Sequence, residues 1–261
     1  MDRERLTAHL QGENEQKIGA FVLDGADIAW KSNRSHATDF YDPYEQKVAK
    51  SILAGLPEIG VMSFGGYRNA ERARLVIYPH FILTDTIETP ITVLQVTGNF
   101  SFTEVSHRDF LGSLLGLGLK REKIGDIICF DQGCQVVVAN EVARFICEHW
   151  RAVHQVTIKV QEIDPEQIAV EPERIKMIKT TVASLRLDAV AASGYGISRT
   201  KMVREIKGDR VKVNWKTITN PAHEIAESDV ISIRGRGRVI VEEVRGETKK
   251  GRTGLLLKRL M

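Results

Sequence analysis

The sequence predicts an α+β fold, with an N-terminal helical segment, a middle α+β domain and a compact basic domain at the C-terminus. Three observations lead to this prediction. Apolar residues recur at helical spacing near the N-terminus, strand and helix patterns alternate from Ile91 to Ile163, and residues 185–214 have the pattern of two short helices and a strand. We place the domains at 1–70, 71–165 and 184–261, with a linker at 166–183.

The charge of the chain is divided between its two ends. Residues 180–261 hold 17 lysines and arginines against 9 acidic residues, a net charge of +8, whereas residues 1–179 hold 20 against 25, or −5. A basic domain on an acidic body is typical of a protein that binds a polyanion through one surface. No apolar run is long enough for a transmembrane helix, and the charged N-terminus lacks the apolar core of a secretory signal.

Two helices are expected near the N-terminus. Apolar residues at helical spacing support one helix over residues 2–20 and another from Glu45 to Leu56. Between them, Asp39–Pro43 has the composition of a turn, in which Asp42 is a candidate N-cap and Pro43 stands at the favoured first helical position.

The middle of the chain alternates between the strand and helix periods. The expected elements are the strand Ile91–Val96, the helix Arg108–Leu117, the strands Ile124–Phe130 and Gln135–Ala139, the helix Glu141–Arg151 and the strand Val156–Ile163. This order is that of the split βαβ or ferredoxin-like fold. RNA-recognition modules share this topology, but the candidate third strand lacks their stacking aromatic pair, and fold alone does not assign a function.

Two glycine-rich loops are candidate contacts for phosphate. Gly65-Gly66 precedes a basic and aromatic segment, where it either lets the backbone approach a phosphate or forms only a tight turn. The stretch from Leu111 to Asp126 lacks the spacing of a P-loop or a dinucleotide turn. It is either a solvated helix end or a second RNA contact, for which the candidate residues are Lys120, Arg121 and Lys123.

The prolines and glutamates of residues 166–183 suggest an acidic linker, although Arg174–Ser184 is also a candidate start for the helix that follows. Apolar spacing over Leu185–Ala191 predicts a helix that ends in the Gly194-Tyr195-Gly196 break. Ser198 is the candidate N-cap of a second helix, Arg199–Lys207. Val211–Asn214 then alternates apolar and polar residues, as a half-buried strand does.

This run resembles the S4 RNA-binding domain, an αL-like fold. The matching motifs are Arg186-Leu187-Asp188, Gly196-Ile197-Ser198-Arg199 and Gly208 through Val213-Asn214. The match continues to Ser228-Asp229, where Ser228 replaces the family's usual glycine. The resemblance implies a domain that binds structured RNA; the alternative is a generic helical hairpin with solvated charges.

The cations of this domain are the candidate RNA contacts, and they are Arg186, Arg199, Lys201, Arg204, Lys207, Arg210, Lys212, Arg234, Arg236 and Arg238. Arg186 and Arg199 also match the S4 motif. The arginines from Arg234 to Arg238 are separated by glycines, so they are expected either to follow a phosphate backbone or to form a disordered loop. A basic tail adds Lys249, Lys250, Arg252, Lys258 and Arg259.

Further motifs extend the resemblance to nearly the whole chain. The chain is similar to the YlmH-type family of S4-domain proteins at Asp39–Pro43, Gly65-Gly66-Tyr67 and Gly116–Asp126. The particular residues in these motifs are similar to those of the cyanobacterial and plastid branch labelled photosystem II S4 domain proteins. The resemblance implies structured RNA as the partner, either ribosomal RNA or tRNA, with association to the large ribosomal subunit in the rescue of stalled translation. A role in photosystem assembly is the alternative.

The expected function is RNA binding without catalysis. S4 domains often accompany RNA-modifying enzymes, which is the rival class, but the seven histidines are scattered and no H-E-x-x-H motif or nucleophile elbow is present. Asp126 and Asp131 remain candidates for a carboxylate pair. Three cysteines without C-x-x-C spacing suggest neither a zinc site nor a disulfide framework. We therefore expect no metal or cofactor, a cytoplasmic location, no membrane insertion and no DNA partner.

Overall fold

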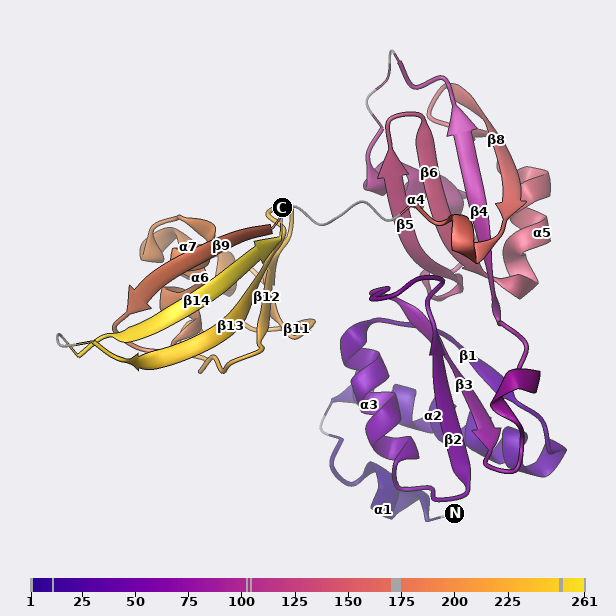
Figure 1. Ribbon diagram of the computed structural model, residues 1–261, viewed down its shortest axis with the longest axis horizontal. Helices are drawn as coiled ribbons and strands as arrows, with labels where there is room; N and C mark the ends of the chain where they lie inside the picture. Colours follow the sequence, from indigo (N-terminus) through magenta and orange to yellow (C-terminus); the bar gives the residue numbers. More distant parts are fainter. Residues whose placement is uncertain are drawn as a thin grey trace. The chain divides into compact units, whose positions relative to one another are not determined.

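The computed structural model describes residues 2–10, 12–101, 103, 105–169, 175–248 and 251–260 (Figure 1). The chain divides into two compact units, Met1–Val170 and Glu171–Met261. Both units mix helices and strands, which confirms the predicted fold class. No helix in the described part of the chain is long and apolar enough to cross a membrane.

The first half of unit one contains a sheet as well as helices. The single helix expected over residues 2–20 is wrong, because one helix ends at Thr7 and another runs from Glu13 to Ser32. Its helices are α1 (Arg3–Thr7), α2 (Glu13–Ser32) and α3 (Pro43–Leu53), and its strands are β1 (His36–Tyr41), β2 (Ile59–Phe64) and β3 (Ala73–Pro79). The strands form an antiparallel sheet in the order β1-β3-β2. The sequence prediction of helices alone up to residue 70 therefore missed this sheet, whose strand β3 lies beyond that boundary.

The helix α3 begins as its sequence predicts. The Asp42 side chain accepts a hydrogen bond from the Glu45 backbone N–H, and the Glu45 carboxylate accepts one from the Asp42 N–H at 2.8 Å, which forms a capping box with Pro43 at the start of the helix. The expected turn at Asp39–Pro43 is wrong over its first residues, because β1 continues to Tyr41 and pairs there with Ala73.

The second half of unit one follows the split βαβ plan. Its elements are β4 (Ile91–Gly98), α4 (His107–Gly116), β5 (Ile124–Phe130), β6 (Gly133–Ala139), α5 (Asn140–His149), β7 (Ala152–Val153) and β8 (Val156–Ile163). The sheet order is β5-β6-β4-β8-β7, with antiparallel neighbours throughout. The helices α4 and α5 cover one face, where Phe110, Ile146 and Trp150 are fully buried (Figure 1). This arrangement confirms the predicted topology.

The other face of this sheet packs against the first half of the same unit and against the segment after β8. Phe40 of β1 packs with Ile91, Val137 and Ala139 in one buried cluster. The Gln135 side chain, only 5% exposed, donates to the Gln167 carbonyl and accepts from the Ala169 N–H. Part of the face that carries RNA in recognition modules is therefore covered here.

The C-terminal unit is a six-stranded antiparallel sheet with two helices. Its elements are β9 (Ile175–Val182), α6 (Leu187–Tyr195), α7 (Arg199–Lys207), β10 (Val211–Val213), β11 (Lys216–Thr217), β12 (Val230–Ile233), β13 (Arg238–Glu247) and β14 (Thr253–Leu260). The sheet order is β11-β10-β12-β13-β14-β9. Figure 1 shows α6 and α7 behind the strands, on one face of the sheet. Val190, Met202 and Ile206 pack there against Val239 and Val241.

The strand β9 lies within the predicted linker 166–183. It pairs with β14 along its whole length, from Ile175 opposite Leu260 to Val182 opposite Thr253. The linker prediction and the alternative of a helix over Arg174–Ser184 are therefore wrong for Ile175–Val182. Glu166 of the predicted linker lies in a short 3-10 helix, Pro165–Gln167. Glu171, Pro172, Glu173 and Arg174 lie outside the described residues, as do Lys249 and Lys250 of the basic tail.

The helix pair closely follows the S4 motif. Gly196 ends α6 with a left-handed φ of 65°, so the helix includes Gly194 and Tyr195, which the sequence placed in a break. The Ser198 hydroxyl caps α7 by accepting from the Lys201 N–H, as predicted. Ser228, at the position of the family's usual glycine, also has a left-handed φ of 69°.

Candidate nucleic-acid interface

A buried carboxylate joins the two helices that carry the S4 motif. Asp188 on α6 is 3% exposed and accepts from Arg186 at 3.0 Å and from Arg199 of α7 at 3.0 Å. Burial disfavours the charge of Asp188, but the hydrogen bonds from the two arginines outweigh it and hold the pKa of this carboxyl below its usual range. Arg186 and Arg199 therefore stabilise the helix pair, while their side chains remain 41% and 53% exposed.

Three of the predicted cations surround one open groove beside α7. Lys201, Arg204 and Arg210 line a depression of about 750 Å³, together with Ser198, Thr200, Glu205 and Gly208. Arg210 lies 3.5 Å from the Glu205 carboxylate, and all three cations are exposed. Lys207 is also exposed, in the last turn of the same helix. Cations that project from a rigid helix into an open groove suit the phosphates of a folded RNA.

The arginine-glycine connection is an ordered hairpin turn between β12 and β13. The Arg236 N–H donates to the Ile233 carbonyl at 2.9 Å, and Gly235 and Gly237 have φ values of 76° and 73°. The Tyr195 hydroxyl lies 2.9 Å from the Gly237 carbonyl. The turn is thus fastened to α6, and the disordered-loop alternative does not apply.

This turn lies next to the groove. The Arg234 N–H donates to the Arg210 carbonyl at 3.3 Å, and β10 and β12 pair directly beyond these residues, with Val211 opposite Ile233. Arg234 is exposed, whereas Arg236 is partly buried. The structure therefore brings the backbones of Arg210 and Arg234 together at one end of the sheet.

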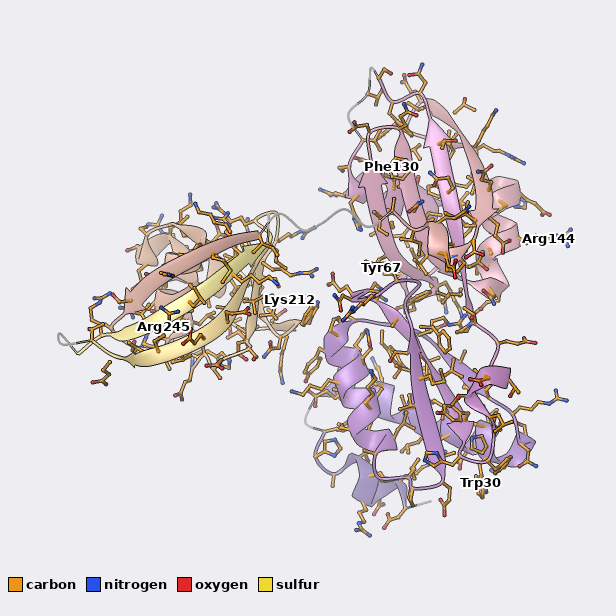
Figure 2. All side chains as sticks on the ribbon, in the orientation of Figure 1. Trp30, Tyr67, Phe130, Arg144, Lys212 and Arg245 are labelled. Carbon is orange, nitrogen blue, oxygen red and sulfur yellow. The ribbon has the colours of Figure 1, made fainter. Side chains whose placement is uncertain are left out.

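Lys212 and Arg238 lie on a different surface. Val211, Val213, Val239 and Val241 point into the core beneath the helices, so their strand neighbours Lys212 and Arg238 point to the opposite, open face of the sheet. The Arg238 guanidinium lies 5.6 Å from the ring centroid of Trp215. Figure 2 labels Lys212 on β10 and Arg245 on β13, two separate strands of this sheet. The predicted set of cations is thus divided between two faces.

The candidate second contact in unit one is mostly engaged within the protein. Arg121 donates to the Ile124 and Gly125 carbonyls, and burial, with the neighbouring Arg72 charge, lowers its pKa to about 10. Lys123 contacts Asp39 at 2.5 Å and Glu141 at 2.8 Å. Lys120 alone of the three is exposed. This loop joins the two halves of unit one.

The segment that begins at Gly65-Gly66 is likewise bound by other parts of unit one. Asp126 accepts from the Tyr67 hydroxyl at 2.8 Å and from the Glu71 and Arg72 backbone N–H groups at 2.7 and 3.1 Å. Gly66 has a φ of 91°, and a Cβ atom there would lie 3.1 Å from Val137. The close approach of the glycine backbone is therefore to the sheet, which supports the tight-turn alternative.

The structure removes the candidate carboxylate pair. Asp126 is the third residue of β5 and Asp131 directly follows the strand, so the ordinary rise of a strand separates them by roughly 16 Å. Among the described residues, no group of three or more His, Cys, Asp or Glu side chains is placed to hold a metal ion.

The sequence reasoning missed the structural role of several motif residues. Asp188 fixes α7 through Arg199, and Asn214 exchanges hydrogen bonds with the Asp229 side chain at 2.7 Å and the Val230 N–H at 2.9 Å. The Arg-Leu-Asp and Val-Asn motifs therefore build the scaffold beneath the groove. The adjacency of opposite charges at Arg186 and Asp188 was the available signal.

Comparisons with known proteins cover almost the whole chain. Residues 14–81 match the family described as "YlmH, N-terminal", residues 86–167 match "Putative RNA-binding domain in YlmH", and residues 185–231 match "S4 domain". The solved structure named cell division protein ylmH from Streptococcus pneumoniae has a TM-score of 0.52 at 19% identity, covering 61% of this chain and 97% of that one, which shows a shared fold.

A curated relative extends the match through both units. Ribosome-associated protein quality control protein P2 from Bacillus subtilis (strain 168) is 35% identical over 238 residues, covering 91% of this chain and 92% of the relative. Together with the matches to the S4 domain and the YlmH RNA-binding domain, this similarity supports RNA binding. The chain belongs to the YlmH family of S4-domain proteins.

Proposed function

We propose that this protein docks on structured RNA, either ribosomal RNA or tRNA, through the groove beside α7, and that it acts as a non-catalytic ribosome-associated factor in translation quality control. The observation that carries the proposal is the groove itself. A helix pair joined by the buried Asp188 holds Lys201, Arg204 and Arg210 around one depression, and Arg234 is hydrogen-bonded to its rim.

The chemistry of the groove suits shape recognition. Its cations contact phosphates, which position a folded RNA without reading its sequence. Ser198 caps α7 and Asp188 fixes its start, so the spacing of Lys201 and Arg204 is set before RNA arrives. A preorganised site loses less side-chain entropy on binding.

The choice of partner rests on the relative. Its name associates the Bacillus subtilis protein with the ribosome and with quality control, and its similarity extends over both units of this chain. This supports a ribosomal role over photosystem assembly, and the proposal puts that role on the large subunit and in the cytoplasm. In unit one, the candidate residues Asp126, Arg121 and Lys123 are hydrogen-bonded to other parts of the protein, which supports a binding role over RNA modification.

The test is the double substitution Lys201→Ala with Arg204→Ala. Both side chains are exposed, so the circular dichroism spectrum should stay unchanged while affinity for ribosomal subunits falls by about 10- to 50-fold, as expected for two lost phosphate contacts. Sedimentation with purified subunits and crosslinking to RNA measure this loss. The matched control is Lys47→Ala with Lys50→Ala, which removes two exposed cations of the same spacing from α3. Equal binding by both variants contradicts the proposal.

A further inference from the structure

The C-terminal sheet has an open face opposite its helices. Three of its strands, β9, β13 and β14, lie outside the residues that match the S4 domain, and they enlarge the sheet beyond that module. Inward residues such as Val241 and Leu257 are fully buried under the helices, whereas their outward neighbours are at least partly exposed. The face is therefore a surface of its own, distinct from the groove beside α7.

Four cations form a diagonal stripe across this open face. The stripe consists of Lys212 on β10, Arg238 on β13, Lys258 on β14 and Lys179 on β9. Lys212 and Arg238 both lie opposite Ser232 of β12 and are thus two strands apart. Lys258 lies one strand further and two residues along, opposite Ile240.

The stripe ends at Lys179, again one strand further and two residues along, because Leu256 pairs with Lys179. Ordinary strand spacing and rise separate the Cα atoms of successive cations by about 8–10 Å, a distance that long Lys and Arg side chains can narrow. No ion pair of Lys179, Lys212 or Lys258 occurs among the described residues. The acidic Glu242 and Glu243 lie at the β13 bulge, and Glu243 is paired with Arg245 at 2.9 Å.

Aliphatic side chains flank the stripe on both sides. Ile175 and Met177 are each 49% exposed on one side, together with the partly exposed Leu260. Ile240 and Leu256 lie on the other side, partly exposed as well. A line of positive charge between two apolar margins fits a ligand with one charged backbone and flat apolar groups beside it.

We infer that the stripe binds a single-stranded segment of RNA, with its phosphates along the cations and its bases over the aliphatic margins. At one end, Arg238 lies over the Trp215 ring, and an aromatic and guanidinium pair offers a surface on which a base can stack. The inference rests on the proposed function, since it adds a second surface for the same class of ligand.

Continuity with the groove favours RNA over an acidic protein segment. The ordered turn after β12 connects Ser232 on the open face to Arg238, and the first residue of this turn, Arg234, donates to Arg210 at the groove. An RNA duplex held at α7 can therefore continue as a single strand around this turn and onto the stripe. An acidic amphipathic peptide is the competing ligand, and the experiment includes it as a probe.

The test compares two double variants. The stripe variant combines Lys179→Gln and Lys258→Gln, and the groove variant combines Lys201→Ala and Arg204→Ala. Fluorescence anisotropy measures binding to an unstructured oligouridylate of about twelve nucleotides, to a ribosomal RNA hairpin and to a peptide rich in Glu and Leu. At about 0.1 M salt each lost phosphate contact weakens single-strand binding by about fivefold, so the stripe variant should lose about 25-fold in oligouridylate affinity. It should keep the hairpin, while the groove variant shows the reverse.

Lys47→Gln with Lys176→Gln is the charge-matched control. Lys176 is an exposed residue of β9 that lies opposite Arg259 and points to the other face from Lys179, so both RNA affinities should persist. The inference is overturned if the stripe variant keeps its affinity for oligouridylate, or if it loses affinity for the peptide and not for oligouridylate. In either case, hairpin binding that is lost only in the groove variant still supports the proposed RNA site in the groove. Failure of the unaltered protein to bind either RNA overturns both proposals.

Discussion

Asp188 and Arg74 show how single buried charges organise this protein. Each is buried and hydrogen-bonded to partners from different elements. Asp188 joins Arg186 and Arg199, and Arg74, 5% exposed, donates to the Thr38 carbonyl at 2.6 Å, the Pro90 carbonyl at 2.8 Å and the Glu141 carboxylate at 2.7 Å. Arg74 thereby links β1, the start of β4 and α5. Arg186 and Arg199 matched the S4 motif, yet the motif alone did not distinguish a phosphate contact from a scaffold contact, because arginine serves both.

Glu141 should make stability depend on pH in acid. Burial opposes its charge, but hydrogen bonds from Arg74 and Lys123 prevail and lower its pKa from 4.5 to about 2. A lowered pKa stabilises the fold above about pH 4.5, and this contribution is lost as the pH falls towards about 2. Glu141→Gln should therefore lower the free energy of unfolding at pH 7 by about 1–2 kcal/mol, at the low end for a charged hydrogen bond because the side chain is 44% exposed.

Urea unfolding between pH 7 and acid measures this effect, and the variant should show the smaller acid loss. Glu148→Gln on the same helix is the control, because its partner Arg144 is 91% exposed and such pairs contribute little. Identical pH profiles for Glu141→Gln and the unaltered protein would falsify this role.

At the scale of elements, the period of apolar residues predicted some parts well and others poorly. The split βαβ domain was predictable because its strands β4, β5, β6 and β8 are long. Clear helical patterns follow β4 and β6, and a turn that ends in glycine joins β5 to β6. The strand β1 was missed because apolar and polar residues do not alternate regularly in its sequence, His-Ala-Thr-Asp-Phe-Tyr. Its polar residue Thr38 is buried, and the Thr38 hydroxyl accepts a hydrogen bond from the Leu75 N–H. The strand β9 was missed because five of its eight residues are exposed and its partner β14 is far along the chain.

Two glycines should respond oppositely to the same substitution. Gly133 begins β6 with a φ of 150°, and a Cβ atom there would lie 1.9 Å from the Val96 carbonyl oxygen of β4. Gly133→Ala should therefore destabilise the fold by about 2–5 kcal/mol through strain and overlap. Gly112 lies within α4 with no atom within 4 Å of its added Cβ, so Gly112→Ala should stabilise by about 0.5–1 kcal/mol.

Thermal unfolding of the two variants measures these shifts, and each serves as the control for the other, because both add one methyl group. A fall in melting temperature for Gly112→Ala, or none for Gly133→Ala, would contradict the backbone positions of the β5-β6 hairpin and α4.

For the whole molecule, the division of charge between the two ends of the chain is the feature that the composition predicted most directly. The local motifs did not reveal it. The net +8 of residues 180–261 is a property of composition, and the structure distributes it over the groove, the hairpin turn and both faces of one sheet. Which cation belongs to which surface depends on strand register and side-chain alternation, which single motifs do not contain. In unit one the opposite holds, because Arg121 and Lys123 are paired internally and add little positive potential for a polyanion.

This division predicts where the salt dependence of RNA binding resides. If about 6–10 phosphates are contacted, affinity should fall by about 10³- to 10⁵-fold between roughly 50 and 200 mM salt. Lys201→Ala with Arg204→Ala should flatten the slope of log affinity against log salt by about 1.4–1.8, because two counterion-releasing contacts are lost. Lys47→Ala with Lys50→Ala removes the same charge from unit one and should leave the slope unchanged, since these cations lie on the acidic unit. Titrations of a ribosomal RNA hairpin at several salt concentrations measure both slopes; equal flattening by the two variants would show that net charge, and not the C-terminal surface, drives binding.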